Sequence, residues 1–183
     1  MKGVYETQVP SDNDILLGEG IYYLNFVDID NRGTVLGATR GGSKLEIEKK
    51  IREMAYDGAY GKSKNLRRYE RYVPRFMVTL LKMTYETLAY GTSCDVTDKG
   101  DYHEMRFRVN IEDTDYIDNI TFVGVKHDGM PCVITLENVL NDGNIEFDFK
   151  EKDEITSELQ YTAHYLSTAM ATPPIKIWEF DTI

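Results

Sequence analysis

Cysteine, proline, histidine and tryptophan are all scarce in this sequence of 183 residues, which contains 2 Cys, 5 Pro, 3 His and 1 Trp. The two cysteines, Cys94 and Cys132, are too few for a disulfide scaffold or a four-thiolate zinc site, and we expect both to be reduced. No run approaches the ~18 apolar residues of a membrane span, and the N-terminal stretch lacks the apolar core of a secretory signal. We therefore expect synthesis in the cytoplasm and no membrane association.

Basic side chains are in the minority as well, because 21 Lys and Arg stand against 31 Asp and Glu, for a net charge of −10. Tight nucleic-acid binders neutralise phosphates with clustered Lys and Arg, so this balance argues against that class of protein. The same balance is compatible with a surface past which nucleic acid must slide without sticking.

Apolar residues make up 42 % of the chain, which is long enough to bury one core, so residues 1–183 are predicted to form a single domain. Tyrosine is abundant, with 13 residues. Two interpretations of this abundance stay open. Tyrosine is common at subunit interfaces, where it buries a large ring and keeps a polar group. It is also simply favoured in strands.

Alternation with a period of two predicts that the chain is mainly β. In the segment 45–52, Leu45, Ile47 and Ile51 point one way, as in a half-buried strand. The charged residues that point the other way are Glu46, Glu48, Lys50 and Arg52. A second, longer strand is predicted over residues 69–83, with Pro74 at an edge or bulge. Further strands are predicted over residues 21–27, 102–111, 120–126, 132–136, 145–149, 159–165 and 175–180. Short strands at such spacing suggest a sandwich or a barrel.

The best helix candidate is the segment 84–90. Thr84 is a plausible N-cap, and Gly91 stands where a helix commonly ends. The helix is about two turns long, so it needs packing to persist. Residues 95–101 are predicted to form a polar turn, and within the strand 102–111 we expect Met105, Phe107, Val109 and Ile111 to face inward.

No catalytic, cofactor or metal site is predicted. The segment 37–44 resembles a phosphate-binding loop only superficially, because Ser43 precedes Lys44 and a strand pattern follows where the motif requires a helix. A tight turn between strands accounts better for its glycines. His103, His127 and His164 are expected in surface or interface roles, since His127 and Cys132 lack a standard zinc spacing.

An acidic cluster is predicted to be a solvated turn rather than a calcium site, because the glycine of an EF-hand loop is missing. Its members are Glu112, Asp113, Asp115 and Asp118. A basic cluster lies in and after a long loop, and comprises Lys62, Lys64, Arg67, Arg68 and Arg71. In an acidic protein this cluster more plausibly faces an acidic surface of a neighbouring copy than nucleic acid. An idle solvated loop is the alternative.

Several blocks of sequence occur in an order that points to a family of proteins. A glycine turn and alternating segment run into a lysine-bearing loop (LGATRGGSKLEIEKKIREMAYDGAYGKSKNLRR), followed by a strand and by TYETLAYG. The blocks VITLENVLNDGNIEFDFKEKDE and QYTAHY come later. In order and extent, over about residues 36–165, the chain resembles the tail tube (major tail) proteins of long, non-contractile phage tails.

This resemblance implies two packed antiparallel sheets with one short flanking α-helix and a long projecting loop. It also implies a structural protein and not an enzyme: subunits form hexameric rings, and the rings stack into a tube through which viral DNA is ejected without sequence-specific binding. The tape measure protein and the tail completion and distal tail proteins would be its other partners, and the virion tail its location.

The resemblance also assigns parts of the chain to contacts between rings. Residues 1–20 would form an N-terminal arm, residues 53–68 an inter-ring loop and residues 168–183 a C-terminal tail. The contact residues expected in the loop are Asp57, Gly58, Tyr60, Lys62, Lys64, Arg67 and Arg68. Two alternatives remain. One is a tube protein of a contractile tail, a type VI secretion system or a bacteriocin-like particle. The other, which we favour less, is a small β-rich ligand-binding module with a pocket near a histidine.

Overall fold

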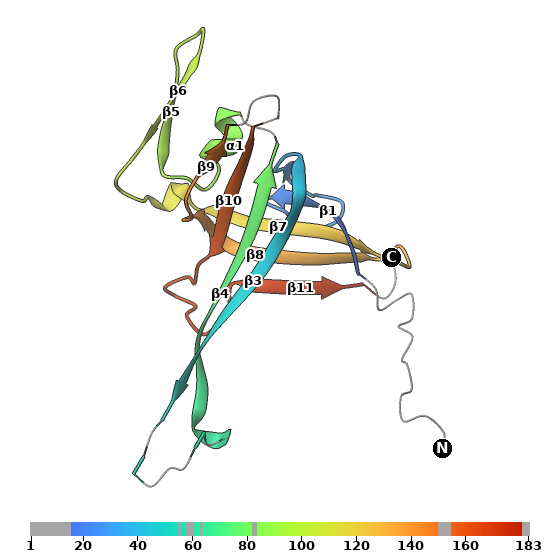
Figure 1. Cartoon of the computed structure of the whole chain (residues 1–183), viewed down its shortest axis with the longest axis vertical. Coiled ribbons are helices and arrows are strands. Elements are labelled where there is room, and N and C mark those ends of the chain that lie inside the picture. Colours follow the sequence, from blue (N-terminus) through green and yellow to red (C-terminus); the bar gives the residue numbers. More distant parts are fainter. Residues whose placement is uncertain are drawn as a thin grey trace.

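The computed structural model describes residues 16–54, 56–57, 61–62, 64–81, 84–149 and 155–180 (Figure 1). Its strands are β1 (Leu16–Leu24), β2 (Thr34–Val35), β3 (Thr39–Glu53), β4 (Arg67–Leu80), β5 (Cys94–Asp98), β6 (His103–Phe107), β7 (Ile117–Lys126), β8 (Pro131–Asn141), β9 (Glu146–Asp148), β10 (Thr156–Ala163) and β11 (Ile175–Glu179). One α-helix, α1 (Tyr85–Ala89), and two 3-10 turns, Lys64–Leu66 and Asp113–Asp115, complete the described elements.

Nine of these strands form one antiparallel sheet. Its order is β2-β1-β7-β8-β10-β4-β3, with β11 added to β8 and β9 added to β10. Strands β5 and β6 form a separate two-stranded ribbon. Figure 1 shows β7, β8 and β11 running across the direction of β10, β4 and β3, so the sheet bends sharply between β8 and β10.

The bend lies at Asn138, where β8 changes its partner. On one edge of β8, residues 132–136 pair with β11 and residues 139–141 pair with β10. Asn138 lies between these two stretches with a φ of +50°, a conformation that asparagine adopts more readily than most residues. Its carbonyl accepts a hydrogen bond from the backbone N–H of His164 at 3.1 Å, and its side-chain amide donates to the carbonyl of His164 at 3.3 Å.

The bend brings the first strands of the sheet onto the last ones. The ring of Tyr22 on β1 meets that of Phe76 on β4 edge-on, with centroids 5.2 Å apart, and its hydroxyl donates to Ser43 of β3 at 2.5 Å. Side chains from β1, β4, β7, β8 and β10 fill the space between, and the most deeply buried are Leu24, Phe76, Val78, Leu80, Ile120, Leu136, Val139, Leu159 and Tyr161. One folded sheet thus encloses the main core.

The predicted β class, the antiparallel pairing and the short helix are confirmed. Thr84 caps α1 by accepting from the backbone N–H of Thr87 at 3.3 Å, and Gly91 follows the helix with a φ of +67°. Hydrogen bonding gives one folded nine-stranded sheet and one ribbon, so the arrangement as two packed sheets stays a prediction.

Three local predictions are wrong. The glycine turn expected in the segment 37–44 is a bulge inside β3, where Gly41 and Gly42 have φ values of +77° and +89° and shift the register against β4. The polar turn expected at residues 95–101 contains β5. The strand expected over residues 102–111 ends at Phe107.

The inward direction expected for the apolar residues of that last strand is also wrong. Phe107, Val109 and Ile111 are exposed by 63 %, 100 % and 58 %, because the ribbon stands off the body instead of joining the main sheet. Alternation identified an extended segment there, but it could not show whether a second sheet covers the apolar side.

We predict that Tyr161→Phe leaves the free energy of unfolding unchanged or raises it by up to about 1 kcal/mol. The Tyr161 hydroxyl is fully buried and has no hydrogen-bond partner among the described residues, and leaving such a group unpaired is unfavourable. Urea denaturation measures the change, with Tyr23→Phe as a control. A loss above about 2 kcal/mol would contradict the prediction.

Burial raises the pKa of Tyr161 far above its ordinary value near 10. Above about pH 10 the unfolded chain therefore loses the phenolic proton while the folded chain keeps it, so stability falls as pH rises. We expect the Tyr161→Phe variant to lose less stability than the wild type between about pH 10 and pH 11, measured by urea denaturation at each pH.

Candidate functional site

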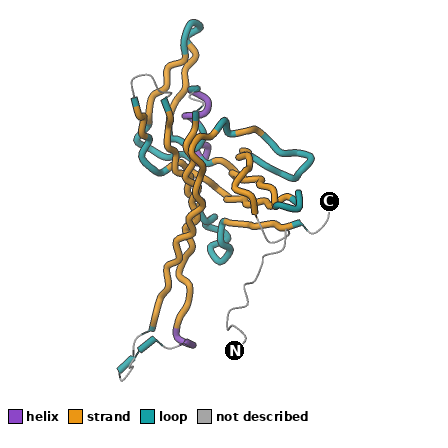
Figure 2. Tube along the Cα trace, turned by 45° about the vertical axis from the view of Figure 1, so that its right-hand side comes forward, coloured by secondary structure: helices purple, strands orange, loops and turns teal. Residues whose placement is uncertain are grey.

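The most distinctive feature of the molecule is the hairpin arm, which we define as the described residues of 46–73. Strand β10 pairs with β4 only from Leu80 to Arg75, whereas β3 continues beside β4 as far as Arg67. Figures 1 and 2 show the resulting two-stranded arm extending away from the body. At its base, the backbone N–H of Tyr72 donates to the hydroxyl of Tyr165 at 2.9 Å. Tyr165 is the second residue after the end of β10.

One face of the arm is apolar. The register of β3 against β4 puts its residues on one side of the ribbon, namely Ile47, Ile51, Tyr69, Tyr72 and Pro74. The rings of Tyr69 and Tyr72 lie with centroids 5.0 Å apart, and Tyr69 is 57 % exposed. The predicted alternation of Leu45, Ile47 and Ile51 is confirmed, but the outer part of this strand is exposed rather than half-buried.

The other face of the arm is charged. Near the body, Arg75 binds Glu46 at 3.3 Å and Glu48 at 2.8 Å. Farther out, Lys50 contacts Glu70 at 3.1 Å. These are exposed or half-exposed pairs, and each contributes little to stability in water. They organise the surface of the arm more than they hold the fold together.

The predicted contact residues lie at the outer end of this arm. Lys62 and Arg67 both contact Glu53, at 3.7 Å and 2.9 Å. Asp57, Lys64 and Arg68 are exposed. Gly58 and Tyr60 lie outside the described residues. The structure therefore brings together the described basic residues of the predicted set at the end of one projection.

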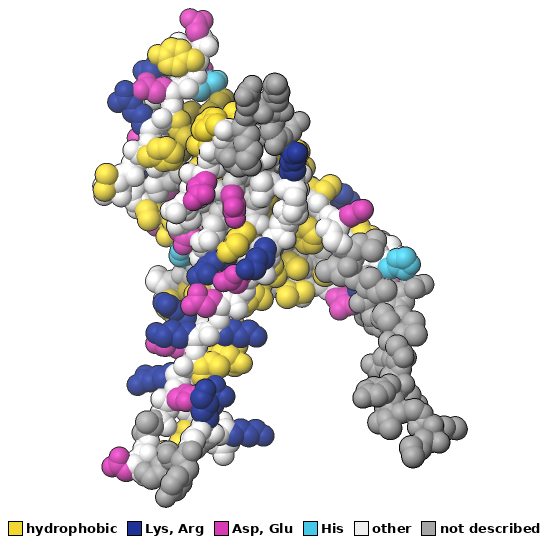
Figure 3. All heavy atoms as spheres, in the orientation of Figure 1, with side chains coloured by type: hydrophobic (Ala, Val, Ile, Leu, Met, Phe, Trp, Pro, Cys, Tyr) yellow, Lys and Arg dark blue, Asp and Glu magenta, His cyan; other side chains and the backbone are white. Residues whose placement is uncertain are grey.

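Charge is strongly segregated along the chain. Residues 49–71 contain eight Lys and Arg against three Asp and Glu, a net charge of +5, so the other residues carry −15. Figure 3 shows many basic side chains along the arm among a few acidic ones, and both kinds on the body. A basic projection on an acidic body favours contact between unlike parts of two copies.

Large apolar side chains are exposed elsewhere too. Beyond the arm and the ribbon, Ile177 is 58 % exposed and Trp178 37 % exposed on β11, which lies at an edge of the sheet. The 15-residue strand β3 forms another edge. Long exposed edges and apolar side chains invite pairing with other chains, and natural proteins usually protect such edges unless assembly uses them.

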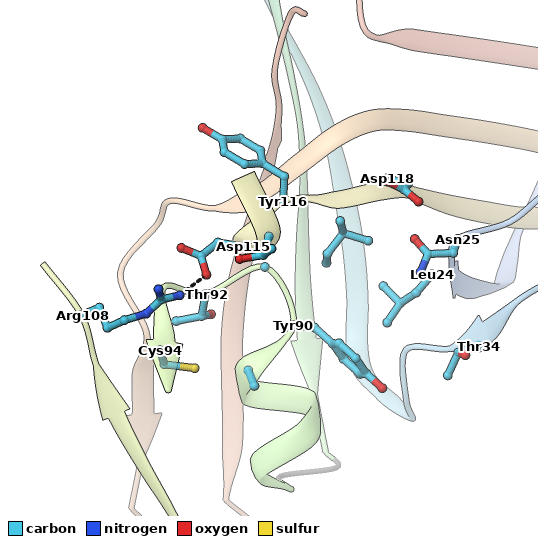
Figure 4. Close-up of a pocket in the computed structure, with 14 residues that line it drawn as sticks. Leu24, Asn25, Thr34, Tyr90, Thr92, Cys94, Arg108, Asp115, Tyr116 and Asp118 are labelled. Atoms are coloured by element: carbon cyan, nitrogen blue, oxygen red, sulfur yellow. Dashed lines mark hydrogen bonds and ion pairs between the residues drawn. The ribbon is translucent and has the colours of Figure 1, made fainter. Parts of the chain in front are cut away.

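The structure also contains a cavity of about 380 Å³ between α1, the start of β5 and the start of β7 (Figure 4). Its dominant feature is the guanidinium of Arg108, which contacts three carboxylates, those of Asp95, Glu112 and Asp115. The hydrogen bond to Glu112 at 2.7 Å is the main cause that raises the pKa of Arg108. Because its charge is compensated, this arginine offers little attraction to an anionic ligand.

Asp115 corrects the prediction of a solvated acidic turn. It is buried, it binds Arg108, and its second carboxylate oxygen accepts from the backbone N–H of Glu112 at 2.8 Å. Asp113 remains exposed, as predicted. The cluster therefore includes a structural ion pair that fixes the connection between β6 and β7.

The histidines and cysteines occupy separate places. His103 stacks on Tyr85 at 3.9 Å, and His164 lies edge-on to Tyr116 at 5.3 Å beside a second cavity of about 460 Å³. Both thiols are free, and burial raises the pKa of Cys94 and of Cys132, which disfavours the reactive thiolate. Across the described residues, no group of three or more His, Cys, Asp or Glu is placed to hold a metal ion.

Comparison of the chain with protein-family models and with curated proteins gives no match. No helix in the described part of the chain is long and apolar enough to cross a membrane.

Sequence reasoning missed two features of the surface. It did not place Lys50 and Arg52 on the same face as Arg68 and Arg71, because that placement depends on a bulge between residues 69 and 71. It also gave no signal that Glu146 would lie directly opposite a second glutamate on the neighbouring strand.

We predict that Asp115→Asn lowers the free energy of unfolding by about 1–3 kcal/mol, because Arg108 loses its most buried partner. The matched control is Asp113→Asn in the same 3-10 turn, which should change stability by less than about 0.5 kcal/mol since Asp113 is exposed. Chemical denaturation of both variants tests the pair, and equal effects would show that Asp115 has no special role.

Proposed function

We propose that this chain is a structural subunit of the tail tube of a phage with a long, non-contractile tail. In this proposal, subunits assemble into hexameric rings, and the rings stack into a conduit through which viral DNA passes. The observation that carries it is the hairpin arm, whose side chains are largely exposed over β3 from Glu48 to Glu53 and over β4 from Arg67 to Arg71. The resemblance over about residues 36–165 gives this arm a role as the contact between successive rings.

The physical character of the arm supports the proposal. A two-stranded ribbon that leaves its body contributes little to the core, so its length is better explained by a contact with another chain. It carries an apolar face with two exposed or half-exposed tyrosines and an opposite face rich in basic groups. These features suit an interface, because apolar and aromatic groups supply burial while charges select the partner and its orientation.

The remainder of the surface fits the same proposal. The exposed strands β3 and β11 can be covered by neighbouring subunits in a ring, which would remove edges that otherwise promote uncontrolled pairing. Head-to-tail stacking of identical rings gives an open assembly that grows into a filament. An acidic body would let DNA slide past without being bound. The tape measure protein and the completion and distal tail proteins are the further partners proposed.

A tube of a contractile tail, a type VI secretion system or a bacteriocin-like particle remains the alternative within the same class, and a neighbouring sheath gene would favour it. The ligand-binding alternative draws its support from the cavity of about 460 Å³ beside His164. Yet the ring of His164 packs on Tyr116, and its Nδ1 lies 3.3 Å from the carbonyl of Asn138, so this histidine is already engaged within the chain.

Shortening the arm tests the proposal. We predict that replacing residues 51–70 by Asn-Gly, which joins Lys50 to Arg71 through a two-residue hairpin turn, abolishes tube formation. The free energy of unfolding should change by less than about 1 kcal/mol, because most of the side chains removed are exposed. Electron microscopy and sedimentation of concentrated protein measure assembly, and denaturation measures stability.

Wild-type protein, alone or with tail initiator proteins, should form rings or tubes under the same conditions. A wild type that stays monomeric at every concentration would count against the tail tube function. Normal tubes from the shortened variant would instead refute the role of the arm while leaving the function open.

A further inference from the structure

The charged face of the arm places like charges directly opposite each other. Lys50 lies opposite Arg71, and Arg52 lies opposite Arg68. All four side chains are exposed, and only Lys50 has a carboxylate, that of Glu70, within ion-pair distance among the described residues. Like charges opposite each other destabilise a ribbon, so two successive basic pairs favour contact with an anionic group.

The body carries an acidic pair of the same construction. Glu146 on β9 lies directly opposite Glu158 on β10, and both are exposed. Neither glutamate forms an ion pair with another residue in the described part of the chain. Within the described residues this pair therefore has no compensating charge, and it matches the basic pairs in geometry with the opposite sign.

The acidic pair and the basic pairs lie on the same side of the sheet. Glu158 stands opposite Thr79 of β4, and Thr79 and Arg71 are eight residues apart in that strand, so their side chains point to the same side. Eight residues of extended chain span about 26 Å. This side of the sheet thus has basic pairs at its outer end and an acidic pair at its body end.

We propose that the basic pairs of one copy bind the Glu146–Glu158 pair of the next copy along the tube. This inference rests on the proposed function and adds the identity of the surface that receives the arm. The basic pairs and the acidic pair lie at opposite ends of β4, so a head-to-tail arrangement of copies can join one to the other. Because the two ends differ, the contact is heterologous and repeats from ring to ring.

Nucleic acid is the other anionic partner that basic pairs could bind. The chain as a whole carries −10, and the residues outside 49–71 carry −15, so a phosphate backbone approaching the arm would be repelled by the body. A second copy supplies the acidic partner without that penalty. The observations therefore favour a contact between copies.

Charge reversal in both directions tests the contact. Arg68→Glu and Glu158→Lys should each raise the protein concentration needed for tube formation by about tenfold or more, because each puts like charges together between copies. Neither should harm folding, since each converts a like-charge pair inside the subunit into an opposite-charge pair. The double variant carrying both reversals should return to within about threefold of the wild type.

The matched control is Arg32→Glu, which makes the same change in charge at an exposed position between β1 and β2, outside the arm, and should shift assembly by less than about threefold. A second measurement uses mixed chains carrying Arg68→Cys or Glu158→Cys, each with Cys94→Ser and Cys132→Ser. Mild oxidation should yield the mixed disulfide between copies, whereas Arg32→Cys should give little of it with Glu158→Cys.

The outcomes separate this contact from the general function. Tubes that form normally from the single reversals, a double variant no better than either reversal, or no mixed disulfide in assembled protein would each overturn the contact and leave the tube function intact. Binding of a 20-base-pair DNA duplex by the wild type that Arg68→Glu abolishes, with unchanged assembly, would also overturn it in favour of nucleic acid.

Discussion

The structure depends on the difference in length between strand β4 and the stretch of it that pairs with β10. Strand β4 has 14 residues, but β10 pairs with it only over its last six positions, from Arg75 to Leu80. That paired half carries Phe76, Val78 and Leu80 into the core. Among the described strands, the other half pairs with β3 alone, and it extends into solvent beyond the hydrogen bond from Tyr72 to Tyr165. The same strand therefore joins the core to the arm, and the arm begins where burial ends.

The outline of this arrangement could be predicted from the sequence. Alternation correctly placed Leu45, Ile47 and Ile51 on one face of β3, and the strand predicted over residues 69–83 corresponds to most of β4. The cap at Thr84 and the left-handed Gly91 were also predicted, because both depend on chemistry within a few residues of the helix ends. Local rules suffice where local contacts decide the structure.

The failures concern features decided by distant partners. The left-handed Asn138 follows from the exchange of β11 for β10 beside β8, which no local pattern reveals. The outward position of Val109 follows from the ribbon standing apart from the main sheet. Asp115 belongs to an acidic run, and its burial beside Arg108 depends on how the chain folds back there. The sequence does not distinguish Asp115 from the other acidic residues of the run, because only the packing of the folded chain buries one of them.

The cross-strand pairs of like charge on the surface also bear on the function. Two like-charge pairs face each other across strands, Arg52 with Arg68 on the arm and Glu146 with Glu158 on the body. Such pairs stabilise a sheet less than opposite-charge or apolar pairs at the same positions would. A chain built for solitary existence gains nothing from such pairs. In the proposed tube, the same groups would set the direction of growth, because a basic end would meet the acidic end of the next copy.

The hydrogen bond between Tyr165 and the backbone of Tyr72 has a mechanical consequence. Among the described residues, this is the outermost hydrogen bond between β4 and the body. From Tyr72 to Arg67 the strand runs about 17 Å and pairs with β3 alone among the described strands. The arm can therefore tilt relative to the body about the hydrogen bond between Tyr72 and Tyr165. A tilt of about 10° at this hydrogen bond would displace Arg67 by roughly 3 Å over that span. In the proposed tube, small tilts of many arms would let the stack curve while each subunit body stayed rigid.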